Sequence, residues 1–133
     1  MITANQLRIG NYVASDHFKD RDVIVKVRLI GQEQAIVEHP NGLTEPMLYQ
    51  GEMRPIKLTE EILFKCGFEK KNGGWHILNL INDWTFIFYQ PLHGVAELSI
   101  NKHGAILSDQ CKYLHQLQNL FYALTGKELE IKF

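Results

Sequence analysis

One face of a predicted helix near the C-terminus carries the side chains whose types and spacing could do chemistry. Four uncharged polar residues recur there at relative positions 0, +3, +4 and +7, the spacing of a single helix face: His115, Gln118, Asn119 and Tyr122. This polar stripe offers an imidazole, two amides and a phenol, groups that bind by hydrogen bonding. No charged residue lies between Lys112 and Lys127, whereas a solvated helix face usually carries Lys and Glu.

Two interpretations of the polar stripe remain open. In the first, it is a contact surface for a protein partner or for a second copy of the chain. In the second, a loop or strand of the same domain covers it and satisfies its amides, because buried polar groups are usually hydrogen-bonded within their own fold. The sequence does not choose between them.

Histidines and carboxylates raise the hypothesis of a metal site, but their spacing disfavours one. The loop Asp16–Asp22 gathers three aspartates and a histidine, yet it lacks the glycine and the closing glutamate of a calcium loop. If residues 81 and 84 close a hairpin, His76 lies opposite Tyr89 and points toward the end of the sheet that carries His93. Two histidines without a third ligand make a poor zinc site, so we predict no metal and no cofactor.

The common catalytic signatures are absent. The chain contains no GxSxG elbow, no GxxxxGK[ST] phosphate loop, no GxGxxG turn and no HExxH helix. Its two cysteines, Cys66 and Cys111, lie in apolar patterns outside any CxxC pair, which predicts reduced core thiols. We therefore predict a non-enzymatic interaction module that docks a protein partner or a second copy near the polar stripe.

The overall charge favours no polyanionic partner. The 133 residues include 14 basic and 15 acidic ones, a net charge of -1, so no global field attracts nucleic acid or an anionic membrane. The N-terminus has no signal-peptide pattern and no segment has the length of a membrane span, which predicts a cytoplasmic protein. A local alternative stays open, in which basic residues of the N-terminal part bind nucleic acid: Arg8, Lys19, Arg21, Lys26 and Arg28.

Residues 1–56 have the pattern of a small antiparallel sheet. We predict a strand over 7–13 with a break at Gly10 and Asn11, and a longer strand over 23–30, where apolar residues recur with a period of two. The four-residue connection 31–34 turns this strand back as a hairpin. Prolines break the remainder into short extended pieces, so we expect a strongly bent sheet, an SH3-like barrel.

Residues 57–133 have the pattern of an α+β unit. Thr59 is suited to cap the start of a short helix, and Gly67 to close it in the left-handed conformation. A meander of three strands follows, over 75–81, 84–90 and 95–100. The segment 105–107 adds a further extended piece.

A long helix and a last strand complete the second unit. We expect Ser108 or Asp109 to cap the helix and Gly126 to end it. The alternation over 129–133 predicts a strand that returns to the sheet. The fold class is thus α+β with two units, 1–56 and 57–133, which we expect to pack together because the passage 53–56 is too short for a free linker.

The second strand of the meander is rich in aromatic residues. Phe86 and Phe88 alternate with Ile87 and Tyr89, so the strand has two apolar faces. Exposed aromatic residues beside basic groups can stack on single-stranded nucleic acid, but this strand has no Lys or Arg. We expect core packing for at least one face. In the next strand Ala96, Leu98 and Ile100 should face the core, with Glu97 and Ser99 on the wet side.

Three segments carry a resemblance to a known family. They are the segment 7–13, Leu-Arg-Ile-Gly-Asn-Tyr-Val; the segment 55–63 with Gly67 and Phe68; and the segment 113–126 around His-Gln-Leu-Gln-Asn. In this order they resemble a family of small uncharacterised proteins of Bacteroides-like bacteria, often found near phage or mobile-element genes. Ile62 stands where the family more often has Trp. The resemblance implies a bacterial cytoplasmic setting and a phage origin, and it supplies no catalytic residue or ligand.

Overall fold

The computed structural model describes residues 2–16, 23–80, 85–100 and 103–133. They form an α+β protein with two antiparallel sheets, divided into two compact units. Unit 1 comprises Met1–Lys57 with Tyr113–Asn119, and unit 2 comprises Leu58–Lys112 with Leu120–Phe133. The first boundary lies one residue from the predicted one. The return of residues 113–119 to unit 1 was not predicted.

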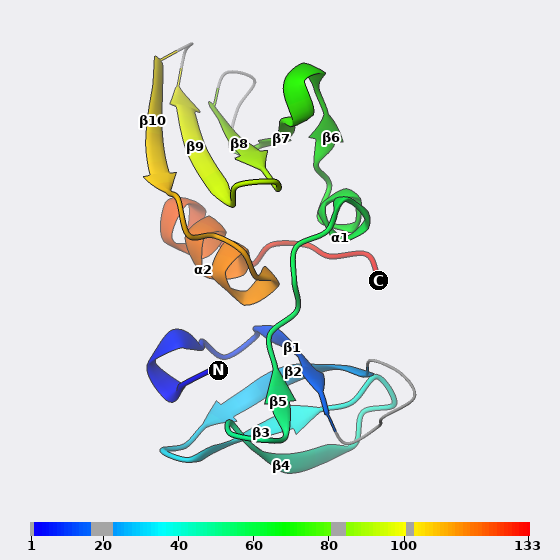
Figure 1. Ribbon diagram of the computed structural model, residues 1–133. Helices are drawn as coiled ribbons and strands as arrows, with labels where there is room; N and C mark the ends of the chain where they lie inside the picture. Colours follow the sequence, from blue (N-terminus) through cyan, green and yellow to red (C-terminus); the bar gives the residue numbers. More distant parts are fainter. Residues whose placement is uncertain (1, 17–22, 81–84, 101–102) are drawn as a thin grey trace. The chain divides into compact units, whose positions relative to one another are not determined.

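Unit 1 is built on a five-stranded antiparallel sheet with the order β4-β3-β2-β1-β5 (Figure 1). No pairing joins β4 to β5 among the described residues, so the sheet is open and the predicted barrel is not observed. The elements are η1 (Ala4–Gln6), β1 (Tyr12–Ser15), β2 (Val23–Ile30), β3 (Gln34–Glu38), β4 (Thr44–Leu48) and β5 (Met53–Arg54).

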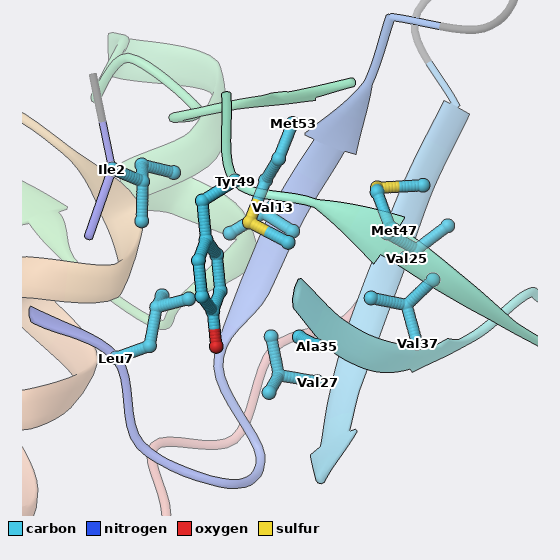
Figure 2. Packing of buried hydrophobic residues seen from close by; sticks show 10 residues of the cluster. All are labelled: Ile2, Leu7, Val13, Val25, Val27, Ala35, Val37, Met47, Tyr49 and Met53. Atoms are coloured by element: carbon cyan, nitrogen blue, oxygen red, sulfur yellow. The ribbon is translucent and has the colours of Figure 1, made fainter. Parts of the chain in front are cut away.

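The two-residue period of β2 and β3 builds the core of unit 1. Val25, Val27 and Val37 are fully buried, and the hairpin closes at Ile30 opposite Ala35, as predicted. Figure 2 shows these valines packed with residues of β1, β4 and the N-terminal segment. Each such buried aliphatic side chain stabilises the fold by about 2 kcal/mol relative to exposure.

The first strand begins later than the sequence predicted. Residues 8–11 form a turn, in which the Asn11 backbone N–H donates to the Arg8 carbonyl at 3.0 Å and the Asn11 side chain accepts from the Arg8 N–H at 2.7 Å. Gly10 has a φ of 102°, which a residue with a side chain rarely adopts. The predicted strand over 7–13 is therefore wrong before Tyr12.

Unit 2 contains the predicted meander, apart from positions 81 and 84, which lie outside the described residues. The predicted extended piece over 105–107 lies in a fourth strand, and a short fifth strand on the opposite side was not predicted. Its sheet has the order β10-β9-β8-β7-β6, and all pairs are antiparallel. The elements before the last helix are α1 (Glu60–Lys65), β6 (Glu69–Lys70), η2 (Asn72–Gly74), β7 (His76–Asn79), β8 (Thr85–Gln90), β9 (Val95–Ile100) and β10 (His103–Ser108).

The two ends of α1 follow the predicted capping chemistry. The Thr59 side chain accepts a hydrogen bond from the Ile62 N–H at 3.2 Å, which satisfies a donor that has no partner in the helix. Gly67 has a φ of 92°, and the Phe68 N–H donates to the Leu63 carbonyl at 3.0 Å. These are the geometry and the bond of a Schellman motif.

The long helix α2 (Leu114–Thr125) differs from the prediction at its start. The strand β10 continues through Ser108, whose hydroxyl accepts from the Gln110 N–H at 3.1 Å in a turn. Ser108 and Asp109 therefore do not cap the helix. Gly126, with a φ of 71°, follows its end as predicted. Of the described helices, none is both long and apolar enough to cross a bilayer.

The segment after α2 is extended but forms no strand. The predicted alternation is present in the sequence, yet residues 126–133 pair with no described strand. A single backbone bond holds the segment near α1, from the Lys132 N–H to the Lys65 carbonyl at 2.9 Å. Leu129 is buried. The predicted final strand is therefore wrong.

Candidate interaction surface

The polar stripe of α2 lies largely inside the protein. His115 is 3% exposed and Gln118 is 1% exposed, whereas Tyr122 is 41% exposed. Asn119 is half-buried. Three members belong to unit 1, and Tyr122 belongs to unit 2.

The Gln118 amide is used by the N-terminal segment of unit 1. Its oxygen accepts from the Tyr12 backbone N–H at 2.9 Å, and its nitrogen donates to the Gly10 carbonyl at 3.1 Å. One side chain thus satisfies a backbone donor and a backbone acceptor at the start of β1. Burial of this amide is tolerated because both of its polar ends are paired.

Asn119 repeats this arrangement one residue later. Its oxygen accepts from the Asn11 side-chain nitrogen at 2.9 Å, and its own nitrogen donates to the Gln6 carbonyl at 3.1 Å. Another part of the same unit therefore covers the stripe and satisfies its amides, which is the second of the two interpretations. As placed here, His115, Gln118 and Asn119 do not offer a free docking surface.

His115 is buried without a full set of hydrogen bonds. Its ring stacks on Tyr113 with centroids 6.0 Å apart and planes 9° from parallel. Its Nδ1 has no hydrogen-bond partner in the part of the chain that the structure describes. Burial disfavours the charged imidazolium and lowers the pKa of His115 to about 4. The residue is neutral at physiological pH.

The basic residues of the nucleic-acid alternative are engaged locally where they are described. Lys26 lies over the Tyr12 ring, 5.8 Å from its centroid, and Arg28 pairs with Glu38 at 3.3 Å. Arg8 donates from Nη1 to the Ile9 carbonyl at 3.2 Å. Lys19 and Arg21 lie outside the described residues. Unit 1 has seven basic and seven acidic residues in its sequence, so it has no net attraction for a polyanion.

The histidines that the structure describes do not gather into a group of three potential metal ligands. His76 lies opposite Tyr89, as predicted, and is 2% exposed. Its Nε2 is 3.9 Å from a Glu60 carboxylate oxygen, and Lys70 approaches the same oxygen at 3.2 Å. No group of three potential ligands forms among the described side chains. The carboxylate loop lies outside them beyond Asp16.

A pocket of about 340 Å³ in unit 2 combines apolar side chains with the charged residues Lys65, Glu130 and Lys132. Phe64, Leu78, Phe121 and Leu129 line it together with Cys66. Burial raises the pKa of the Cys66 thiol to about 12, and that of Cys111 likewise. Both cysteines are free and buried, which confirms the predicted reduced core thiols. A thiol of this kind is not a nucleophile at neutral pH.

The sheet of unit 2 has one buried and one half-exposed face. Ile87 and Tyr89 of β8 are 0% and 1% exposed, so one face of the aromatic strand packs in the core, as predicted. The other face carries five apolar residues that are only partly buried or exposed. We call them the aromatic face: Trp75, Ile77, Phe86, Phe88 and Ile106.

The register of the sheet brings the aromatic face together. Ile77 lies opposite Phe88, Phe88 opposite Glu97, and Glu97 opposite Ile106, so these side chains share one side of four adjacent strands. Phe86 and Phe88 meet edge to face with centroids 6.2 Å apart, and Trp75 and Phe88 do so at 6.5 Å. The side of the sheet that we predicted to face solvent therefore carries aromatic side chains around Glu97.

The strand β10 adds an open edge to this face. It spans six residues without a charged side chain, and its only described neighbour in the sheet is β9. Ile106 on it is 69% exposed. The register shifts after Ile106, which leaves a regular run over 103–106. An exposed edge strand presents unpaired backbone groups to any other extended chain.

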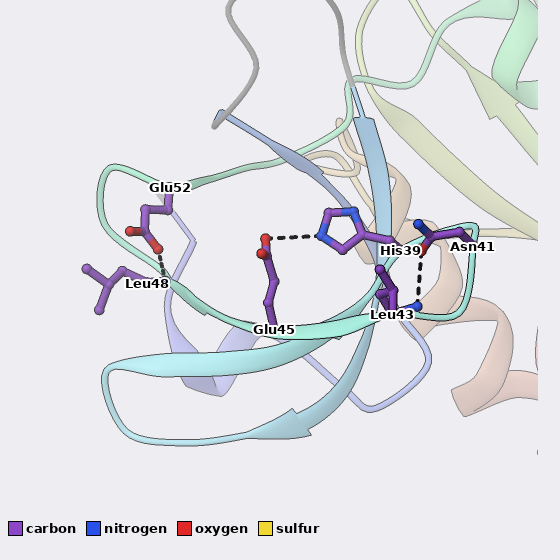
Figure 3. Close-up of polar contacts among 6 residues, drawn as sticks. All are labelled: His39, Asn41, Leu43, Glu45, Leu48 and Glu52. Atoms are coloured by element: carbon purple, nitrogen blue, oxygen red, sulfur yellow. Dashed lines mark hydrogen bonds and ion pairs between the residues drawn. The ribbon is translucent and has the colours of Figure 1, made fainter.

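The other three sheet edges are protected. Strand β4 contains Glu45 and Pro46, and the N–H of its Leu48 already donates to the Glu52 carboxylate at 2.7 Å (Figure 3). Strands β5 and β6 have two residues each, and each contains a charged one. Proline, charge and shortness are the usual means by which proteins prevent edge pairing. Only β10, of the four described edges, lacks all three.

The fold and the surface define a mixed α+β protein with two antiparallel sheets and one unprotected edge. Comparisons with protein families, with curated proteins and with solved structures found no match to this chain. The surface was not predicted from the sequence. The signal that could have found it is the uncharged, two-residue alternation over 103–108 beside the aromatic strand.

Proposed function

We propose that the protein is a non-enzymatic interaction module that binds an extended polypeptide segment along β10 and the adjoining aromatic face. The observation that carries the proposal is the open, uncharged edge of β10 beside Ile106, Phe86 and Phe88. Backbone pairing along an edge gives affinity, and side-chain contacts beside it give selectivity. Aromatic side chains are enriched where proteins bind one another.

The charge on the aromatic face favours a protein over a nucleic acid. Glu97 lies between Phe88 and Ile106 in the register, so a phosphate backbone would meet a carboxylate there. Aromatic platforms for single-stranded nucleic acid combine stacking with basic groups. Strands β8, β9 and β10 contain no Lys or Arg. A polypeptide can place a donor or a basic side chain on Glu97.

Unit 1 carries the alternative candidate function. Its succession of strand, long loop, hairpin and short return supports an SH3-like arrangement in an open form, and such units serve many binding functions. Nucleic-acid binding by its basic residues is the alternative, and the resemblance to phage-associated proteins suits either activity. The ion pair of Arg28 with Glu38 weighs against that alternative.

A matched pair of variants tests the proposed surface. Peptides selected from a displayed library of extended sequences should bind the wild-type protein with micromolar affinity. Ile106→Lys should weaken binding at least tenfold, because it places a charge on the edge. Leu92→Lys, at an 80% exposed position between β8 and β9, should leave it unchanged.

Two outcomes would contradict the proposal. In one, the selected peptides bind both lysine variants equally. In the other, no peptide is selected, while labelled oligonucleotides bind the wild type with an affinity that falls steeply with salt, as counterion release requires. The second outcome would support the nucleic-acid alternative, and Lys26→Ala with Arg28→Ala should then reduce binding.

A further inference from the structure

We infer that the occupant of the β10 edge is a second copy of this chain, which pairs its own β10 antiparallel around Ala105. This inference rests on the proposed function and names its partner. In the pair, Gly104 of each protomer lies opposite the partner's Ile106, and the two sheets continue into one. Gly104 and Ile106 provide the observations that carry it.

Gly104 has no explanation within the described chain. Its φ is not positive, unlike that of eight other glycines. A Cβ built on it would meet the Glu97 carboxylate at 3.5 Å and the Leu98 carbonyl at 3.9 Å, which are ordinary contacts. Glycine weakens a strand through its entropy and its missing side chain. A glycine inside a strand often marks a place where another backbone or ligand approaches closely.

Ile106 is the complementary half of this arrangement. It shares a face with Gly104 two residues away, and 69% of it is exposed. Antiparallel pairing centred on Ala105 sets residue 104 of one chain against residue 106 of the other, at both places by symmetry. Facing side chains lie about 5 Å apart in such a ladder. Each isoleucine would then cover the space that the partner's glycine leaves open.

The charge of the edge also suits a second copy. Strand β10 has no charged residue, so its self-pairing brings no like charges together. The apolar Ile106 of one copy needs no charged counterpart when it lies beside Gly104 of the other. A single strand pair buries less surface than a stable dimer needs. We therefore expect a dissociation constant on the order of 10–100 μM.

Cysteine cross-linking tests the register. Ala105→Cys should form a disulfide-linked dimer under a glutathione redox buffer, because facing residues lie within the Cα separation of a disulfide. His103→Cys, on the same strand face, is the control. Two copies of residue 103 would be four residues out of register, about 13 Å apart, which is too far. The native thiols of Cys66 and Cys111 are buried and do not compete.

Sedimentation equilibrium of the full chain tests whether the side chains of β10 contribute to dimerisation. The wild type should dimerise with rising concentration between about 10 and 500 μM. Ile106→Lys should remain folded and monomeric, because it replaces the apolar side chain that covers the partner's Gly104 with a charged one, whereas Leu92→Lys, at an exposed position between β8 and β9, should dimerise like the wild type. Circular dichroism checks that each variant is folded.

Three results would overturn the inference: a monomeric wild type, an Ile106→Lys variant that dimerises normally, or cross-linking of His103→Cys as readily as of Ala105→Cys. A monomer that still binds selected peptides through Ile106 would overturn the second-copy inference alone. A monomer without such binding would overturn the proposed function as well.

Discussion

Replacing Gln118 with alanine is expected to lower the free energy of unfolding by about 3 kcal/mol. The change leaves the Tyr12 N–H and the Gly10 carbonyl without the partners that Gln118 now supplies at 2.9 and 3.1 Å. Each unpaired buried group costs about 1–3 kcal/mol. The lost side chain also leaves a space where Gln118 is only 1% exposed. Urea denaturation monitored by circular dichroism measures the effect.

An exposed glutamine provides the control for this prediction. Gln110→Ala makes the same chemical change at an exposed position and should alter stability by less than about 0.5 kcal/mol. Equal stability of Gln118→Ala and the wild type would show that the two hydrogen bonds add nothing to folding. The polar stripe would then again be available for a partner.

These hydrogen bonds also join two segments that are far apart in the sequence, 7–13 and 113–126. Gly10 and Tyr12 belong to the segment 7–13, while Gln118 and Asn119 belong to the segment 113–126. Three side-chain bonds connect these segments across more than 100 positions in sequence, and a fourth joins Asn119 to Gln6. A structural role within unit 1 explains the polar residues Asn11, Gln118 and Asn119 without a ligand.

The sequence predicted local structure where the deciding interactions are local. Thr59 and Gly67 set the ends of α1 through bonds that span a few residues, and the alternation of β2 placed its valines in the core. The predicted start of α2 was wrong because serine suits a turn as well as it suits a helix N-cap. Pairing of β10 with β9 extends the strand through that residue, and this pairing is tertiary information.

The exposure of the candidate surfaces could not be predicted for a related reason. Helical spacing correctly placed Gln118 and Asn119 on one face, but spacing cannot show that residues 6–12 cover that face. The alternation of β8 correctly separated two faces, yet it could not show that Phe86 and Phe88 stay half-exposed. The open edge of β10 depends on which strands are neighbours. Whether a face is buried depends on the segment that covers it, and periodicity carries no information about that segment.

Acidification is expected to destabilise the protein through His115. The unfolded chain binds a proton at this residue below about pH 6.5, whereas burial lowers the pKa in the folded state to about 4. Between these values the unfolded state binds more protons, so stability that is fully present above pH 6.5 is lost as the pH falls toward 4. A difference of this size corresponds to an upper value of about 3 kcal/mol.

His115→Leu isolates this contribution. Leucine has a similar volume, and the Nδ1 of His115 has no hydrogen-bond partner among the described residues, so the variant should lie within about 1 kcal/mol of the wild type at pH 7.5. Urea denaturation from pH 7.5 to 4 should show a smaller loss of stability in the variant than in the wild type. All other side chains are common to both proteins, so the difference between the two curves reports on His115.

Replacement of an exposed histidine is the control for removing an imidazole from the protein. His93→Leu changes a histidine at an exposed position and should keep the pH dependence of the wild type, because substitutions at exposed positions away from special contacts have little effect on folding. Parallel curves for the wild type and His115→Leu would mean that His115 takes up its proton equally in both states. The packing of His115 against Tyr113 would then have to open below pH 6.5 at little cost in free energy.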